Sequence, residues 1–313
     1  MIGLPFQGMV GGEETFIGNH SVIRAGTYIY AGNQIGHHFQ TGNKANIREL
    51  NVIGNKVSIG TLSVIEHHVT IGDGVSIHTQ VFVPEYTILE SCCWIGPNVV
   101  IRRNTTIGVG NKIYQFSSVG EDPQYAGYQN EETYLEIGDR NVIREYCTLN
   151  RGSPVGSGTT RIGNDNLIMA YAHIAHDSLL GDHVVFANGA SLAGHVEIGD
   201  HAILGGFTLV HQFCRIGAHS MTGIGAVCLQ DVPPYIVAAG NTASPCGLNI
   251  RGLRRRGFSE PTIQALREAY RCLYRQELSL DRALGELDRI ACSVKEVVAL
   301  ADFVRGSSRG IIR

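Results

Sequence analysis

A strict six-residue repeat, a small residue at one place in most repeats, and a change to helical spacing near the C-terminus together predict the fold class. From Ile17 to Ile113 an aliphatic residue opens every unit, with Thr41 as the single exception. An α-helix needs spacings of three and four, and a half-buried strand alternates at two, so neither fits. Three units make an 18-residue coil, and stacked coils bury a core that no single coil buries alone. We therefore expect an all-β left-handed parallel β-helix followed by a small α-helical domain.

Interruptions of the repeat divide the chain into parts. The expected parts are a lead-in at 1–16, the β-helix at 17–235 with loops at 121–136 and 150–161, a connector at 236–258 and a helical domain at 259–313. Loops that leave a solenoid commonly carry binding work. The two prolines at 233 and 234 end the repeat because proline cannot donate to a strand ladder. Glycines, as in Asp73-Gly74, should supply backbone freedom at the bends.

The C-terminal part has the spacing of amphipathic helices. Apolar residues recur every three or four positions at 263–273, 284–290 and 297–304. Ser259 is the expected N-cap of the first of these helices, and Ser293 with Glu296 forms a capping-box pattern for the last.

Composition limits the function classes. The chain has a net charge of −3 and no long apolar run, which argues against a nucleic-acid binder by bulk charge and against a membrane span. The N-terminus lacks a basic segment followed by an apolar one, so no secretory signal is expected. Eight scattered cysteines without a CxxC pair favour reduced thiols in a cytoplasmic protein. Four of them occupy small-residue places and are expected to fill the core: Cys93, Cys147, Cys214 and Cys228.

Two features point to partners. Between positions 251 and 275 seven arginines stand against two glutamates, which suggests an acidic partner or a phosphate, although a solvated helix face is an open alternative. The flat sides of a β-helix usually pair, so we expect a homotrimer with residues of two subunits across a cleft.

Histidines concentrate between positions 173 and 219. His173, His176, His195 and His211 fall on outward places of the repeat. The 18-residue coil sets Asp177 beside His195 and His176 beside Gly194. Imidazoles beside a carboxylate can act as a general base with an orienting partner, or they can bind a metal ion. They can also be surface histidines without a chemical role, and spacing alone leaves all three interpretations open.

The segment from Gly110 to the C-terminus, about 110–313, resembles bacterial UDP-N-acetylglucosamine O-acyltransferases. The matching runs include IYQFSSVGE, IGNDNLIMAYAHIAHD, LAGHVEIGD, LGGFTLVHQFCRIGAHS, QDVPPYIVAAGN, GLNIRGLRRRGFS and the final RGIIR. The resemblance implies transfer of an (R)-3-hydroxyacyl chain from acyl carrier protein to the 3-hydroxyl of UDP-N-acetylglucosamine, the first step of lipid A biosynthesis. It implies neither metal nor cofactor, only the phosphopantetheine thioester of the carrier as donor.

The resemblance also implies roles for single residues. His176 is the implied general base, Asp177 its orienting partner, and the Gly194 amide the oxyanion donor. The implied substrate-binding residues are His173, His195, His211 and Gln212 in the cleft, and Asn249, Arg255 and Arg256 at nucleotide or phosphopantetheine phosphates.

Three positions depart from the family pattern. In the first loop Gln124 is retained as a sugar contact, but Tyr125 and Gly127 stand where the family has Asp and Lys. Ile224 stands where enzymes with long acyl donors tend to have Gly, which predicts a shorter hydroxyacyl donor. Arg251 stands where some relatives carry Glu.

The N-terminal part has roughly three additional coils and looks more like sugar acetyltransferases of the same fold, so a composite chain is one interpretation. Two alternative functions stay open: an acyl-CoA-dependent sugar O- or N-acyltransferase, and a non-catalytic scaffold whose arginine face binds an acidic protein.

Overall fold

The structure is a computed structural model that describes residues 1–5, 13–292 and 294–313. It divides into two compact units, Met1–Ser178 and Leu179–Arg313. The boundary between the two units lies within the predicted β-helix.

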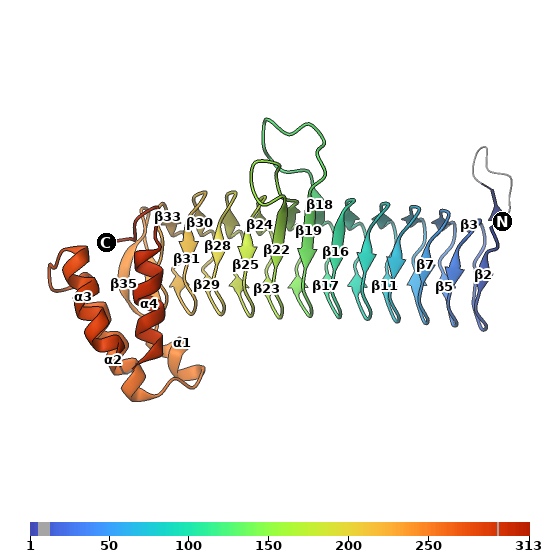
Figure 1. The fold of residues 1–313 in the computed structure, drawn as a ribbon. Coiled ribbons are helices and arrows are strands. Elements are labelled where there is room, and N and C mark those ends of the chain that lie inside the picture. Colours follow the sequence, from blue (N-terminus) through green and yellow to red (C-terminus); the bar gives the residue numbers. More distant parts are fainter. Residues whose placement is uncertain (6–12, 293) are drawn as a thin grey trace. The chain divides into compact units, whose positions relative to one another are not determined.

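The first unit is a stack of β-helical coils with three parallel sheets as its sides (Figure 1). One sheet contains β1 (Ile2–Leu4), β3 (Tyr28–Tyr30), β6 (Asn46–Ile47), β9 (Val64–Ile65), β12 (Phe82–Val83), β15 (Val100–Ile101), β18 (Ser118–Glu121), β21 (Thr148–Asn150) and β24 (His173–Ile174). Another contains β2 (Phe16–Ile17), β4 (Gln34–Ile35), β7 (Val52–Ile53), β10 (Thr70–Ile71), β13 (Ile88–Leu89), β16 (Thr105–Ile107), β19 (Tyr134–Ile137) and β22 (Thr159–Ile162). The last contains β5 (Gln40–Thr41), β8 (Ser58–Ile59), β11 (Ser76–Ile77), β14 (Trp94–Ile95), β17 (Lys112–Ile113), β20 (Val142–Ile143) and β23 (Leu167–Ile168).

The six-residue repeat explains this architecture. Ile53 pairs with Ile71 and Ile71 with Leu89, so each opener lies on the opener one coil away, and all three side chains are buried. Thr41, the exception, is also buried, and its hydroxyl lies 3.2 Å from that of Thr27, so its polar atom is satisfied inside the core. The predicted parallel β-helix is confirmed.

The bends differ from the expectation that glycine supplies them. Most carry a side-chain-bearing residue in the left-handed region, such as His38 at φ 58° and Lys56 at φ 56°, while Gly74 is one of the few glycines there. This conformation costs an L-residue roughly 1–2 kcal/mol. Packing of the stacked coils must offset that cost, and the repeat therefore tolerates many residue types at its corners.

Two loops leave the first unit on the same side of the coil stack (Figure 1). The first loop, residues 122–133, joins β18 to β19, and the second loop, residues 151–158, joins β21 to β22. Both are shorter than expected, because the flanking strands extend into the predicted loop ranges.

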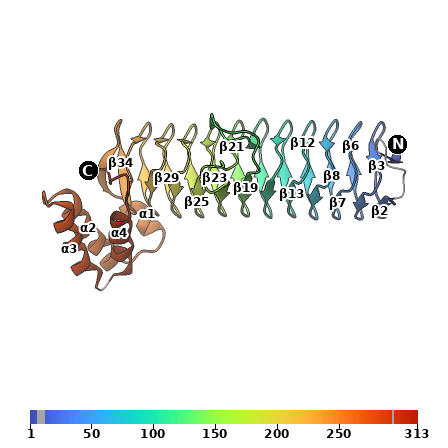
Figure 2. The same ribbon diagram turned by 45° about the horizontal axis from the view of Figure 1, so that its top comes forward.

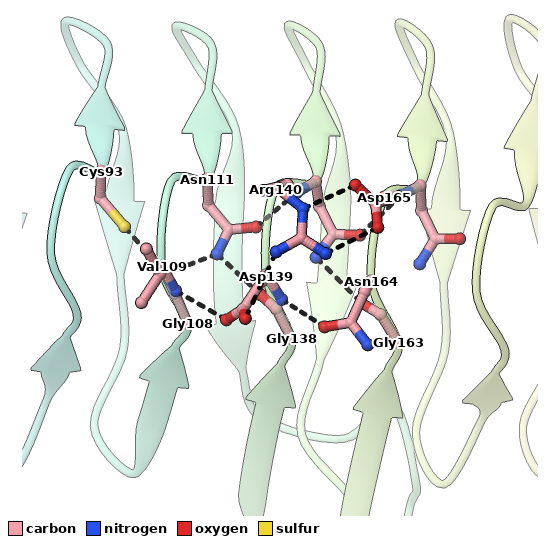
Figure 3. Close-up of polar contacts among 12 residues, drawn as sticks. Cys93, Gly108, Val109, Asn111, Gly138, Asp139, Arg140, Gly163, Asn164 and Asp165 are labelled. Carbon is pink, nitrogen blue, oxygen red and sulfur yellow. Dashed lines mark hydrogen bonds and ion pairs between the residues drawn. The ribbon is translucent and has the colours of Figure 1, made fainter.

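An asparagine ladder carries the coils past these loops (Figure 3). The backbone N–H of Asn141 donates to the side-chain Oδ1 of Asn111, 30 residues earlier. In the same way the backbone N–H of Asn166 donates to Oδ1 of Asn141, 25 residues earlier, and both distances are 2.9 Å. Outside the coil, Asp139 accepts from the Val109 amide at 2.8 Å. The corner directly before β17, β20 and β23 therefore keeps its register although the coils contain inserted residues.

The second unit contains further coils and a helical bundle. Its strands are β25 (Leu179–Leu180), β26 (Val185–Phe186), β27 (Ser191–Leu192), β28 (Glu197–Ile198), β29 (Ile203–Leu204), β30 (Leu209–Val210), β31 (Arg215–Ile216), β32 (Met221–Thr222), β33 (Val227–Cys228), β34 (Ile236–Ala239) and β35 (Ser244–Leu248). Its helices are α1 (Ile250–Arg255), α2 (Glu260–Tyr274), α3 (Leu280–Ala291) and α4 (Lys295–Arg305), of which α2, α3 and α4 pack side by side (Figure 2).

The helical tail follows its apolar spacing. Ile263, Leu287 and Leu300 are fully buried in one cluster. Ser259 caps α2 as expected, because its side chain accepts from the Thr262 amide. Ser293 lies outside the described residues, and the N-cap position of α4 is Val294.

The ends of the expected parts hold more structure than the sequence indicated. The lead-in contains β1, which pairs with β3, and the connector contains the antiparallel pair of β34 and β35 followed by α1. Cys93, Cys147, Cys214 and Cys228 are buried as expected. No helix in the described ranges is long and apolar enough to cross a membrane.

Candidate active site

The predicted site residues are distributed over both units. Gln124, His173, His176 and Asp177 belong to the first unit, and Gly194, His195, His211, Gln212, Ile224, Asn249, Arg255 and Arg256 belong to the second. Each set is described within its own unit.

In the first unit, His176 and Asp177 form a hydrogen-bonded pair directly after β24. The distance from His176 Nδ1 to Asp177 Oδ2 is 2.9 Å, and the side chains are 13% and 1% exposed. Asp177 occupies a left-handed corner at φ 58°, so neighbouring residues can turn their side chains toward each other. An Nδ1–H donated to the carboxylate leaves Nε2 unprotonated, which is the form that a general base requires.

The second loop encloses the Asp177 carboxylate. Oδ2 accepts from the Ser153 amide at 3.0 Å and from the Ser153 hydroxyl at 2.5 Å. Oδ1 accepts from the Gly158 amide at 3.1 Å and lies 3.3 Å from the Ser157 hydroxyl, whose one proton also reaches the Thr159 carbonyl at 2.8 Å. A Cβ on Gly156 would lie 2.4 Å from the carboxylate carbon, so only glycine permits this approach. The loop therefore holds the carboxylate in the orientation that His176 needs.

The buried side chain of Arg151 holds the first loop in place. Its side chain is 1% exposed, and it donates to the Gly120 carbonyl at 2.6 Å and to the Tyr128 hydroxyl at 3.1 Å, and forms an ion pair with Asp122. Because Arg151 also begins the second loop, one buried side chain ties the two loops together. Gln124 is exposed on the first loop.

His173 lies on β24, beside the pair. Its Nδ1 is 2.7 Å from the Thr148 hydroxyl. Burial first, and then the neighbouring His176, lower the pKa of His173 below its ordinary value of 6.5. The side chain therefore stays neutral and can act as a hydrogen-bond donor or acceptor rather than as a cation.

In the second unit, the amide of Gly194 is open. At the corresponding place in other coils the amide donates outward, as from Asp182 to Asp200 Oδ1 at 2.9 Å. The Gly194 amide donates to no acceptor within the described ranges of the chain. An outward-facing N–H without a partner is the group that an oxyanion requires.

The other two outward histidines of the second unit have different neighbours. His195 stacks on Phe213 with ring centroids 4.5 Å apart. His211 and Gln212 are exposed, and His211 Nδ1 is 3.0 Å from Arg309 Nη2. Stacking fixes the plane of one imidazole, and the C-terminal arginine contacts the other.

Two residues expected at phosphates are engaged in the fold. Asn249 is the N-cap of α1, accepts from the Gly252 amide at 3.1 Å and donates to the His219 carbonyl at 2.9 Å. Arg256 donates to the His201 imidazole and carbonyl. Arg255 is exposed, so of the three only Arg255 presents its whole charged group outward.

His201 and His219 belong to a stacked row of rings. Their centroids are 4.8 Å apart, and His219 Nδ1 is buried without a hydrogen-bond partner among the described residues. Burial, followed by the charges of His201 and Arg256, lowers the pKa of His219 to about 4.

Comparison with known proteins gives the family. A family model described as UDP-N-acetylglucosamine O-acyltransferase, domain 2, matches residues 231–312, and the bacterial transferase hexapeptide model matches 52–85 and 159–194. An acyl-[acyl-carrier-protein]–UDP-N-acetylglucosamine O-acyltransferase of Thiobacillus denitrificans is 50% identical over 203 residues, which are 65% of this chain and 79% of that protein. The chain belongs to the UDP-N-acetylglucosamine O-acyltransferase family. A family member from Halorhodospira halophila is 51% identical over 209 residues, 67% of this chain and 81% of its own.

Solved structures of family members resemble the fold. A UDP-N-acetylglucosamine acyltransferase from Bacteroides fragilis is 38% identical, with a TM-score of 0.77 over 80% of this chain and 98% of its own. The enzyme of Francisella novicida is 31% identical, with a TM-score of 0.65 over 100% of this chain and 94% of its own.

The hydrogen bonds at Asp177 weigh against a metal site built on this carboxylate. Oδ2 already accepts from His176 and twice from Ser153, and Oδ1 accepts from the Gly158 amide with the Ser157 hydroxyl 3.3 Å away. A metal ion would have to displace these donors, and the same donors suit a carboxylate that orients an imidazole.

Sequence reasoning missed the residues that hold the site. It identified the second loop by its Gly and Ser content but did not connect Ser153, Gly156 or Ser157 with Asp177. The available signal was that composition, because hydroxyls and bare amides are the donors that a buried carboxylate needs. Nothing in the repeat pointed to Arg151 as a buried anchor.

Proposed function

We propose that this chain transfers an (R)-3-hydroxyacyl group from acyl carrier protein to the 3-hydroxyl of UDP-N-acetylglucosamine, the first step of lipid A biosynthesis. Membership of the acyltransferase family supports the reaction class. The observation that carries the mechanism is the pair of His176 and Asp177 at 2.9 Å, held by the second loop.

In the proposed mechanism His176 acts as general base. Nδ1–H is donated to Asp177, so the lone pair of Nε2 takes the proton of the sugar 3-hydroxyl as that oxygen attacks the thioester carbon. A tetrahedral oxyanion forms, and the open amide of Gly194 donates to it. The intermediate then collapses, the carbon–sulfur bond breaks, and the proton on Nε2 passes to the leaving phosphopantetheine sulfur.

Other residues position the substrates. Gln124 on the first loop contacts the sugar, and His173, His195, His211 and Gln212 bind the substrates. The exposed Arg255 faces a phosphate of the nucleotide or of phosphopantetheine, and Asn249 and Arg256 support α1 behind it. The arginine-rich segment that contains α1 and α2 suits acyl carrier protein, an acidic partner.

We further propose a cytoplasmic homotrimer that needs no cofactor. In that assembly Ile224, which is 85% exposed on the single chain, limits the length of the acyl group. Trimer formation can be checked by light scattering of the purified protein.

The decisive experiment offers the purified protein UDP-N-acetylglucosamine and 3-hydroxyacyl carriers of graded length, with acetyl-CoA as a parallel donor. We expect transfer from the carriers and loss of turnover in His176→Ala with an unchanged circular dichroism spectrum. Transfer from acetyl-CoA alone would favour the acyl-CoA-dependent alternative. If no acyl group is transferred but acyl carrier protein still binds, the scaffold alternative is favoured. If the purified protein contains one bound zinc per subunit, a metal mechanism is favoured.

A further inference from the structure

The C-terminal run RGIIR has no role in the mechanism above, yet the structure holds it firmly within the second unit. The Ser307 hydroxyl donates to Asp231 Oδ2 at 2.7 Å, the Asp231 amide donates to the Gly310 carbonyl at 2.9 Å, and the Ile312 amide donates to the Asp231 carbonyl at 2.9 Å. Asp231 itself is fully buried. The backbone on either side of Arg309 is therefore fixed by one buried aspartate.

This anchoring brings Arg309 to His211, 98 residues earlier in the chain. The distance from Arg309 Nη2 to His211 Nδ1 is 3.0 Å. Burial and Asp231 raise the pKa of the Cys214 thiol to about 11, and the positive charge of Arg309 acts in the opposite direction. The contact with His211 thus places the guanidinium beside the imidazole.

The chemistry of the contact decides which imidazole nitrogen carries the proton. A guanidinium has only donors, so a hydrogen bond from Arg309 requires an unprotonated Nδ1 and puts the proton on Nε2. A second partner pulls the other way, because the Gln212 carbonyl lies 3.2 Å from Nδ1 and can only accept. Without Arg309, that carbonyl would favour the Nδ1–H tautomer.

We propose that Arg309 is a positioning residue that holds His211 in the Nε2–H tautomer and so presents a neutral hydrogen-bond donor to a substrate oxygen. The inference rests on the proposed function in one respect, namely that exposed His211 faces the substrate. Arg309 acts through His211 and touches no reacting atom.

The direct test reads the tautomer. Nitrogen-15 shifts of the His211 ring, assigned with His211→Asn, are compared in the wild type, Arg309→Met and Arg309→Lys. Arg289→Gln is the matched control, because Arg289 is an exposed arginine on α3 that pairs only with nearby Glu286 in the described contacts. We expect an unprotonated Nδ1 in the wild type and the control, a shift toward Nδ1–H in Arg309→Met, and recovery in Arg309→Lys. A wild-type Nδ1–H ring, or shifts that Arg309→Met leaves unchanged, would overturn the proposal.

A kinetic arm separates this inference from the proposed function. Arg309→Met should lower kcat/KM by roughly 10-fold or more, as expected for loss of one hydrogen bond to a substrate, while Arg309→Lys restores part of it. A purely structural role would lower the thermal midpoint without moving the tautomer. If no variant transfers an acyl group, the wild type included, while the tautomer responds to Arg309 as expected, the proposed function fails and the positioning role stands.

Discussion

Replacing Asp177 by asparagine tests the His176 pair with a minimal change. The amide has nearly the shape of the carboxylate but carries one donor group where the carboxylate has only acceptors. Every described contact of the two carboxylate oxygens, from Ser153, Ser157, Gly158 and His176, is with a donor or a potential donor. The side chain of the Asp177→Asn variant therefore meets a donor–donor conflict in either orientation.

The structure predicts the size of the effect. The NH₂ group is best placed at the Oδ1 position, where it loses the hydrogen bond from the Gly158 amide at 3.1 Å, whereas the Ser157 hydroxyl oxygen can accept from it. Loss of this one hydrogen bond to a charged group costs about 2 kcal/mol in the free energy of unfolding. The remaining oxygen still orients His176, but no negative charge stabilises the imidazolium, so kcat should fall roughly 1,000-fold. In the other orientation the base is lost altogether.

Acyl transfer under saturating substrates and urea unfolding measure the two effects separately. Asp139→Asn is the matched control. Asp139 also accepts a hydrogen bond from a backbone N–H, that of Val109 at 2.8 Å, but it lies beside the asparagine ladder and away from the His176 pair. The reasoning is refuted if Asp177→Asn keeps kcat within about 3-fold of the wild type, or if Asp139→Asn lowers kcat as much.

Three further changes have defined outcomes. The pKa of His219 falls from 6.5 to about 4 on folding, so between these values the unfolded chain binds more protons than the folded one, and stability decreases as the pH is lowered. We expect a loss of about 1 kcal/mol from about pH 7.5 to about pH 5, measured by urea unfolding, because the half-buried imidazole is partly screened by solvent, and a flatter profile in His219→Phe, since Phe213 occupies an equivalent corner. Arg151→Met leaves the Gly120 carbonyl without its donor and half-exposed Asp122 without its partner, and should cost about 2 kcal/mol and expose residues 122–133 to limited proteolysis; an unchanged cleavage pattern would contradict the anchor. Ile224→Gly should lengthen the best hydroxyacyl donor in the graded-carrier assay, and an unchanged preference would remove its role as length limit.

The six-residue repeat predicted the architecture because its information is local. Ile53, Ile71 and Leu89 each need only face inward, and the pairing partner is always one coil away. The same argument placed buried Cys93 and Cys228 and the apolar faces of the helical tail. The bends were less predictable, because packing between coils overrides the preference of residues such as Lys56 against positive φ.

The candidate site was predicted only in part. The spacing around His176 and Asp177 was visible, and the structure joins them at 2.9 Å. Their orienting shell was not visible, since Ser153 and Gly158 lie in a loop without periodicity, 24 and 19 residues from Asp177.

The sequence by itself determined the fold class, the buried openers and the histidine-bearing coils. The reason is that the length of the repeat tells which residues lie next to each other in neighbouring coils. Only the tertiary structure decided which donors surround Asp177, that Arg151 ties two loops together, and that Arg309 reaches His211 across 98 residues. The physical reason is that periodic burial sets the path of the backbone, whereas hydrogen bonds at a site depend on where non-repeating segments fold back. Those segments are directed by single buried polar residues, and no pattern of spacing encodes their partners.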